Sequence, residues 1–164
     1  MDCFDTDALI NLMKIRAVGE DVPPESRPWK EYLRRLEEQG QSAAVLLPAP
    51  VVAEFLSGIP EEKWPDALGF FRAHFQIAEL NFQAAEAAAK IFSQQKRRGG
   101  VGGGQEKQCI RTDTFIVAIA IINNCERLFS LDERMGPLIE IAQSELGAKV
   151  SLLREPDIPQ MPLF

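Results

Sequence analysis

Short apolar runs, each the length of a buried strand, alternate along this chain with longer segments in which apolar residues recur at helical spacing. Parallel strands need long crossover connections, which are usually helices. The alternation therefore predicts an α/β fold of three layers, in which helices cover both faces of a mostly parallel sheet. The strands are expected at residues 1–4, 43–47, 75–78, 127–130 and 149–152. The helices are expected at residues 8–15, 29–38, 51–56, 65–73, 82–98, 112–123 and 135–146.

The size and apolar content of the chain fit one domain. It has 164 residues, of which 46% are apolar, and this is enough to fill a core. We assign residues 1–154 to a single domain and residues 155–164 to a proline-rich C-terminal tail. No apolar run is long enough to span a membrane, and the N-terminus is acidic where a signal peptide would be basic. We therefore expect a cytoplasmic protein that does not enter the membrane.

The cysteines and the histidine narrow the chemistry that is available. Cys3, Cys109 and Cys125 form no CxxC pair, and Cys3 and Cys125 lie in apolar stretches, so core positions are expected rather than disulfides. His74 is the only histidine, which removes most zinc sites and the Ser-His-Asp triads. If the protein is an enzyme, carboxylates must do the work. The net charge of −6 argues against indiscriminate binding of nucleic acid, unless the acids are metal ligands.

Four acids fall where predicted strands end or predicted helices begin. Asp5 and Asp132 follow strands, whereas Glu54 and Asp113 lie near the starts of helices. The carboxyl ends of parallel strands meet at one edge of the sheet, where α/β proteins bind ligands. Each acid taken alone is explained by its favourable interaction with the positive end of a helix. Four together repel one another unless cations neutralise them, and carboxylate oxygens are the ligands that Mg²⁺ and Mn²⁺ prefer.

The four acids lie in four short motifs, which read in chain order FDTDALI, PAPVVAEFLSG, RTDTFIVAIAI and LFSLDERM. In this order and spacing the motifs resemble those of PIN-domain proteins, of the kind found as the toxin in VapBC toxin–antitoxin pairs. The resemblance spans nearly the whole chain. It implies a PIN-like three-layer fold and a metal-dependent endoribonuclease that hydrolyses RNA phosphodiester bonds. It also implies an antitoxin protein as a partner and a homodimer.

The resemblance assigns the site residue by residue. The matching acids become both the catalytic residues and the ligands of one or two Mg²⁺ or Mn²⁺ ions. In sites with two metals, the ions stabilise charge on the attacking and leaving oxygens of the phosphate. No histidine is needed for this chemistry. The residues so assigned are Asp5, Glu54, Asp113 and Asp132.

The crowded start of the chain and one serine have supporting roles in this interpretation. Asp7 stands where the family often has serine or asparagine, and it either caps the first helix or adds a fifth carboxylate. Asp2 is expected to be a surface or strand-edge charge. Ser130 stands where the family often has threonine, and its hydroxyl is placed to orient Asp132 or a water on the metal.

Five basic residues flank the glycine-rich segment GGVGGG at residues 99–104. They either complement the C-terminal end of a helix or form a rim that contacts the phosphates of RNA, and the sequence favours neither interpretation. The glycine segment is either a mobile loop near the site or a surface linker. The five basic residues are Lys96, Arg97, Arg98, Lys107 and Arg111.

Two other functions stay open at this point. DTDAL resembles the DxD start of haloacid-dehalogenase-like phosphatases, but the Gly or Ser and the Thr that follow DxD in that family are absent. LFSLDERM also lacks the late acidic pair that those phosphatases need. The second alternative is a PIN-like module that binds RNA or protein without catalysis, and failure to bind Mn²⁺ would favour it.

Overall fold

The computed structural model describes residues 1–19, 23, 26–99 and 105–157, except for the side chains of residues 41 and 105–109. The described strands form one sheet in the order β3-β2-β1-β4-β5, and every neighbouring pair is parallel. The predicted mostly parallel sheet is thus confirmed. The strands are β1 (Asp2–Phe4), β2 (Val45–Pro48), β3 (Gln76–Ala78), β4 (Arg127–Phe129) and β5 (Ser151–Leu153).

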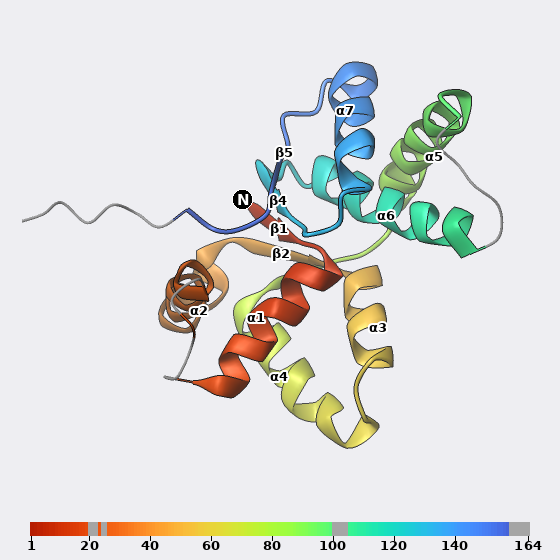
Figure 1. The fold of residues 1–164 in the computed structure, drawn as a ribbon. Coiled ribbons are helices and arrows are strands. Elements are labelled where there is room, and N and C mark those ends of the chain that lie inside the picture. The colour runs from red at the N-terminus through yellow and green to blue at the C-terminus, as the bar shows by residue number, and fades with distance from the viewer. Residues whose placement is uncertain (20–22, 24–25, 100–104, 158–164) are drawn as a thin grey trace, which may run out of the picture.

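Helices cover both faces of this sheet, so the predicted three-layer architecture is confirmed as well. The helices α1, α2 and α4 lie on one side and α5, α6 and α7 on the other (Figure 1). Helix α3 contacts both α1 and α6 and so connects the two layers. The α-helices are α1 (Thr6–Val18), α2 (Arg27–Gln39), α3 (Ala49–Ser57), α4 (Trp64–His74), α5 (Phe82–Arg97), α6 (Gln105–Ile122) and α7 (Met135–Leu146). Two short 3₁₀ turns, Gly40–Ala43 and Glu61–Lys63, complete the elements.

The core forms where the apolar strands meet aromatic side chains from α2. Phe4 and Phe129 on neighbouring strands lie with their ring centroids 5.3 Å apart. Trp29 and Tyr32 of α2 approach both rings at centroid distances between 5.5 and 5.9 Å. All four side chains are buried, and tilted or edge-on ring pairs of this kind add to the stability gained from burial. The packing fixes β1 and β4 side by side, and these two strands carry the first and last of the predicted site acids.

Asp2 corrects one prediction, because it is not a surface charge. Its carboxylate is buried and accepts hydrogen bonds at 2.7 Å from both Nε and Nη2 of Arg127, and at 2.6 Å from the Tyr32 hydroxyl. Buried charges are tolerated when they are paired in this way. Asp2 begins β1, so it lies at the amino end of the sheet, away from the strand ends that carry the predicted site.

The structure also bears on what the sequence predicted for the cysteines, the histidine and the membrane. Cys3 and Cys125 are buried and free, as predicted, whereas the side chain of Cys109 lies outside the described residues. The ring Nδ1 of His74 lies 3.0 Å from the Leu36 carbonyl oxygen, so the histidine packs between helices. None of the described helices is long and apolar enough to cross a membrane. Residues 100–104 of the glycine segment and 158–164 of the tail lie outside the described residues.

Candidate active site

Asp5 lies directly after β1 and is the N-cap of α1. Its Oδ1 accepts a hydrogen bond from the Thr6 backbone N–H at 2.6 Å, and its Oδ2 accepts one from the Ser130 hydroxyl at 2.7 Å. The side chain is only 6% exposed. Burial raises the pKa of Asp5 to about 7, against the lowering effect of the Ser130 hydrogen bond and with a further increase from Asp7. Asp5 is therefore a helix cap whose ionisation the folded protein resists.

Asp113 lies in the interior of α6 and not at a helix start. The helix begins at Gln105, seven residues before the predicted start at residue 112, so the capping explanation for Asp113 is wrong. The side chain is 9% exposed, and its Oδ2 is buried without a hydrogen-bond partner among the described residues. Burial raises the pKa of Asp113 to about 6; Arg134 lowers it, and the carboxylates of Asp132 and Glu54 raise it. A buried acceptor without a donor, facing like charges, is unfavourable for the protein alone.

Glu54 lies in the second turn of α3, the helix that follows β2. Its Oε2 accepts a hydrogen bond from the Thr6 hydroxyl at 2.6 Å. Thr6 is buried beside Asp5, so one residue of α1 holds a carboxylate from α3. The sequence analysis did not single out Thr6, although its place between two aspartates in FDTD was the available signal.

Asp132 lies in the loop after β4, three residues before α7 begins at Met135. Its carboxylate accepts hydrogen bonds from the backbone N–H of Arg134 at 2.8 Å and from the Arg134 Nε at 2.8 Å, and Nη2 of the same guanidinium also donates to it. These bonds hold the pKa of Asp132 below its usual value. The sequence analysis missed Arg134, for which the only signal was its position two residues after Asp132 in LDER.

Ser130 and Asp7 connect the loop after β4 to the start of α1. The buried Ser130 hydroxyl donates to Asp5 and accepts from the Asp132 backbone N–H at 3.0 Å. Both carboxylate oxygens of Asp7 lie 3.0 Å from the Leu131 backbone nitrogen, which donates to them. Asp5 and not Asp7 is the N-cap of α1, so that alternative for Asp7 is wrong. The two side chains instead fix the backbone that carries Asp132.

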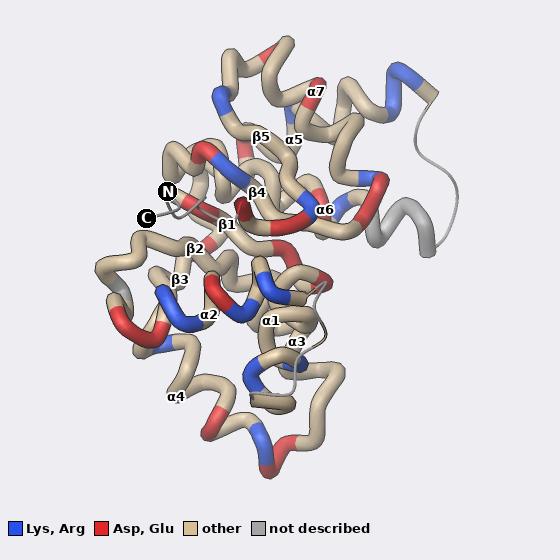
Figure 2. The backbone as a smooth tube through the Cα atoms, turned by 60° about the vertical axis from the view of Figure 1, so that its left-hand side comes forward, with Lys and Arg blue, Asp and Glu red and all other residues tan. Residues whose placement is uncertain are grey.

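The four predicted acids form one electrostatic group, which we call the acidic site (Asp5, Glu54, Asp113 and Asp132). Asp113 raises the pKa of Asp5, and Glu54 and Asp132 raise the pKa of Asp113. Acidic stretches of the backbone gather where β1, β4 and α6 come together in Figure 2. Within the described part of the chain, however, no three His, Cys, Asp or Glu side chains are arranged as ready ligands of one metal ion. The four carboxylates thus affect one another electrostatically, but they are not directed at one common point where a single ion would bind.

Repulsion and hydrogen bonds both act on the carboxylates of the acidic site. Like charges repel, and three of the four carboxylates are held by hydrogen bonds from Thr6, Ser130 or Arg134. The Asp113 Oδ2 has no such partner. A divalent cation would supply the missing partner and would offset the cost of ionising the buried carboxyls. The residues that would hold it are the members of the acidic site.

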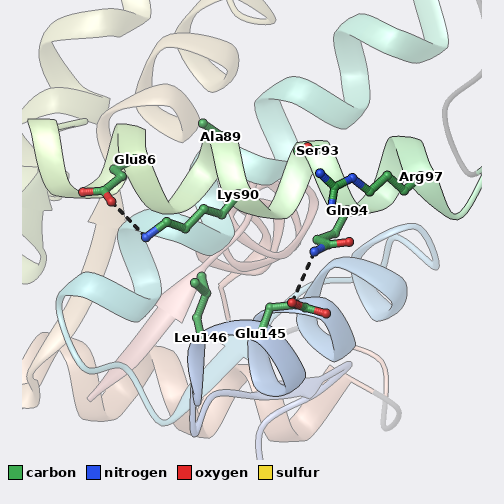
Figure 3. Close-up of a pocket in the computed structure, with 8 residues that line it drawn as sticks. All are labelled: Glu86, Ala89, Lys90, Ser93, Gln94, Arg97, Glu145 and Leu146. Atoms are coloured by element: carbon green, nitrogen blue, oxygen red, sulfur yellow. Dashed lines mark hydrogen bonds and ion pairs between the residues drawn. The ribbon is translucent and has the colours of Figure 1, made fainter.

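Three of the predicted basic residues lie at the end of α5, which carries no member of the acidic site. Lys96 and Arg97 end α5, and Arg98 follows as its C-cap. Arg97 lines a groove between α5 and α7, where the Gln94 amide donates to the Glu145 carboxylate at 3.2 Å (Figure 3). No member of the acidic site lines this groove.

The two remaining basic residues both lie on α6. The guanidinium of Arg111 lies 5.4 Å from the centre of the Phe92 ring, and the side chain of Lys107 lies outside the described residues. Contact of any of the five basic residues with RNA stays a prediction.

The fold and the site together define a class: a three-layer α/β protein with buried carboxylates at the carboxyl edge of a parallel sheet. The family model for the PIN domain matches residues 3–139. The chain belongs to the PIN domain family. The match includes all four members of the acidic site together with Asp7, Ser130 and Arg134.

Known proteins resemble this chain in sequence and in fold. It is 33% identical over 91 residues to Ribonuclease VapC1 of Methanocaldococcus jannaschii, a match that covers 56% of this chain and only 60% of that relative. The crystal structure of VapBC2 from Rickettsia felis, bound to a DNA fragment from its promoter, superposes with a TM-score of 0.61 and 13% identity, covering 93% and 98% of the two chains.

A second solved structure gives the same fold. FitAcB from Neisseria gonorrhoeae superposes with a TM-score of 0.56 at 18% identity, covering 93% of this chain and 96% of that one. At such identities the solved structures establish the fold alone.

Proposed function

We propose that this protein is an endoribonuclease that uses Mg²⁺ or Mn²⁺ to hydrolyse RNA phosphodiester bonds. The observation that carries the proposal is the buried Asp113 Oδ2, which has no hydrogen-bond partner among the described residues and faces the charges of Glu54 and Asp132. Such an atom is explained by a cation that binds there. The chemistry that one or two such cations supply is activation of water near neutral pH and neutralisation of charge on the phosphate.

The residues of the chain have distinct roles in this proposal. Asp113 and Asp5 are the buried ligands, and their raised pKa values would fall when a cation binds, since a nearby positive charge favours the carboxylate. Glu54 approaches from α3, where Thr6 orients it. The Ser130 hydroxyl bridges Asp5 and Asp132, because it donates to the Asp5 carboxylate and accepts from the Asp132 backbone N–H. In this proposal the cation is bound and oriented by groups from the start of α1, from α3, from α6 and from the loop after β4.

The partners follow from the relatives and rest on the same proposal. The relative in Methanocaldococcus jannaschii is named a ribonuclease, and the solved neighbours are titled as VapBC or FitAcB assemblies, two of them with DNA. We propose RNA as the substrate of this chain, an antitoxin protein as its inhibitor, and a homodimer as its assembly. The location that this implies is the cytoplasm, where RNA and such a partner would meet it.

The test is cleavage of a pool of structured RNAs by the purified protein with Mn²⁺, with Mg²⁺ and with EDTA. Asp5→Asn is the matched variant, because asparagine keeps the helix cap and removes the charge. Cutting that needs metal and disappears in the variant is the expected result. Cutting that persists in EDTA, or equally in Asp5→Asn, would overturn the proposal.

The same preparation distinguishes the alternatives. A module that binds without catalysis would leave the RNA intact and would show no change of melting temperature with Mn²⁺. Hydrolysis of a generic phosphomonoester without RNA cleavage would instead indicate a phosphatase. Membership of the PIN domain family favours the nuclease over the phosphatase.

A further inference from the structure

Arg134 is a cation that donates directly to a member of the acidic site, Asp132. Its backbone N–H and its Nε donate to Oδ1 of Asp132 at 2.8 and 3.1 Å, its Nε also reaches Oδ2 at 2.8 Å, and its Nη2 donates to Oδ2. Both oxygens of this carboxylate are therefore engaged by one arginine. A two-point contact between guanidinium and carboxylate is among the stronger side-chain pairings.

The charge of Arg134 reaches beyond Asp132. It also lowers the pKa of Asp113, whose buried Oδ2 has no hydrogen-bond partner among the described residues. The guanidinium thus faces the acidic site and partly neutralises it.

We propose that Arg134 is an internal counter-cation that occupies Asp132 in the metal-free protein, and that a divalent metal ion must displace it in order to bind. The proposal rests on the proposed function, since it concerns the same acidic site. Arg134 and a metal ion compete because both need the Asp132 oxygens and because two cations repel at short range. Arg134 is a positioning residue here, and it touches no reacting atom.

The exposure of the pair makes such an exchange feasible. The Arg134 side chain is 47% exposed, whereas that of Asp132 is 23% exposed. Arg134 precedes the first residue of α7, Met135, and its side chain is the more exposed partner of the pair. A plain structural alternative exists, in which Asp132 and Arg134 only form a local turn that starts α7. That alternative predicts no effect of the arginine on metal affinity.

The test is calorimetric titration of Mn²⁺ into the purified protein at pH 7.5 without RNA. For Arg134→Gln we expect the Kd for Mn²⁺ to fall roughly threefold to tenfold, the range for losing a competing, half-exposed ion pair. Arg134→Lys keeps the charge but loses the two-point contact, so an intermediate Kd is expected. Melting temperature without metal should fall in Arg134→Gln, because repulsion within the acidic site is less well balanced.

Arg154→Gln is the matched control. Arg154 belongs to the same surface, where it donates to the Leu131 carbonyl oxygen at 3.3 Å and lies 3.6 Å from Glu133, without touching Asp132. Its removal takes away one positive charge and should change the Kd by less than about twofold.

Each outcome has a defined meaning. An unchanged or weaker Mn²⁺ affinity in Arg134→Gln, with normal binding by the wild type, would overturn this inference and leave the proposed function intact. An equal gain in Arg154→Gln would overturn it too, because the effect would then be general charge. Absence of Mn²⁺ binding by the wild type and all variants would overturn both the inference and the proposed function.

Discussion

Asp5→Asn separates charge from shape at the acidic site, because asparagine differs from aspartate mainly in lacking the charge. The amide oxygen can still accept the Thr6 N–H that Asp5 accepts at 2.6 Å, and asparagine is as good an N-cap as aspartate. The amide nitrogen can donate to the Ser130 hydroxyl, which has acceptor capacity to spare. We therefore expect the variant to fold, to lose catalysis, and to be more stable than the wild type when no metal is present.

The expected gain in the free energy of unfolding follows from the pKa of Asp5, which burial raises from 3.8 to about 7. The folded protein holds the proton more tightly than the unfolded chain, so ionisation costs folding free energy. The cost is absent below about pH 4, grows as the pH rises from 3.8 to about 7, and is then constant. At 1.36 kcal/mol per pKa unit the upper bound near pH 8 is about 4 kcal/mol. Local relaxation around the charge reduces this, and we expect the variant to gain about 1–3 kcal/mol.

The assay is urea denaturation in EDTA at pH 8 and pH 5, with the free energy of unfolding compared at each pH. The gain should be larger at pH 8 than at pH 5. Asp2→Asn is the control, because Asp2 is buried but paired with Arg127 and Tyr32, and its variant should lose stability at pH 8. A loss of more than about 1 kcal/mol in Asp5→Asn at pH 8 would refute the reasoning, since Asp5 would then be a structural charge.

Three further predictions concern the site and the core. Saturating Mn²⁺ should raise the melting temperature of the wild type, by about 2.7 kcal/mol of added stability at a hundred times its Kd, and should do so much less in Asp113→Asn. Ser130→Ala removes a hydrogen bond that lowers the pKa of Asp5, so the acidic limb of the pH–cleavage profile should move to higher pH. Phe129→Ala should lower the free energy of unfolding in urea by about 3–5 kcal/mol, because its fully buried ring packs on Phe4, Trp29 and Tyr32.

Local patterns were sufficient to predict the elements of this fold. The strand predicted at 43–47 is observed at Val45–Pro48, and the helix predicted at 135–146 is observed at those bounds. A short apolar run between helical segments is typical of a strand in a parallel sheet, because such a strand is buried on both faces. The start of α6 was missed because the glycine segment at 99–104 suggested a longer interruption than the structure has.

The polar contacts between distant parts of the chain were predicted less well, and the reason is sequence separation. Asp2 was predicted to be a surface or strand-edge charge, yet it is buried and Arg127 pairs with it from 125 positions away. Asp7 was predicted to cap the helix beside it or to add a fifth carboxylate, yet it accepts from the backbone N–H of Leu131, 124 positions away. Hydrophobic periodicity reports which face of an element is buried. It carries no information about which polar group on another element completes a hydrogen bond.

The central claim is that the acidic site holds a divalent cation, and the most direct measurement is a crystal structure of the wild type with Mn²⁺, phased to reveal the anomalous signal of manganese. The account predicts a manganese peak in contact with the Asp113 Oδ2, which has no hydrogen-bond partner in the described part of the chain, with Asp5 as a second ligand. No peak at saturating Mn²⁺, or a peak elsewhere on the protein with Asp113 unchanged, would contradict it.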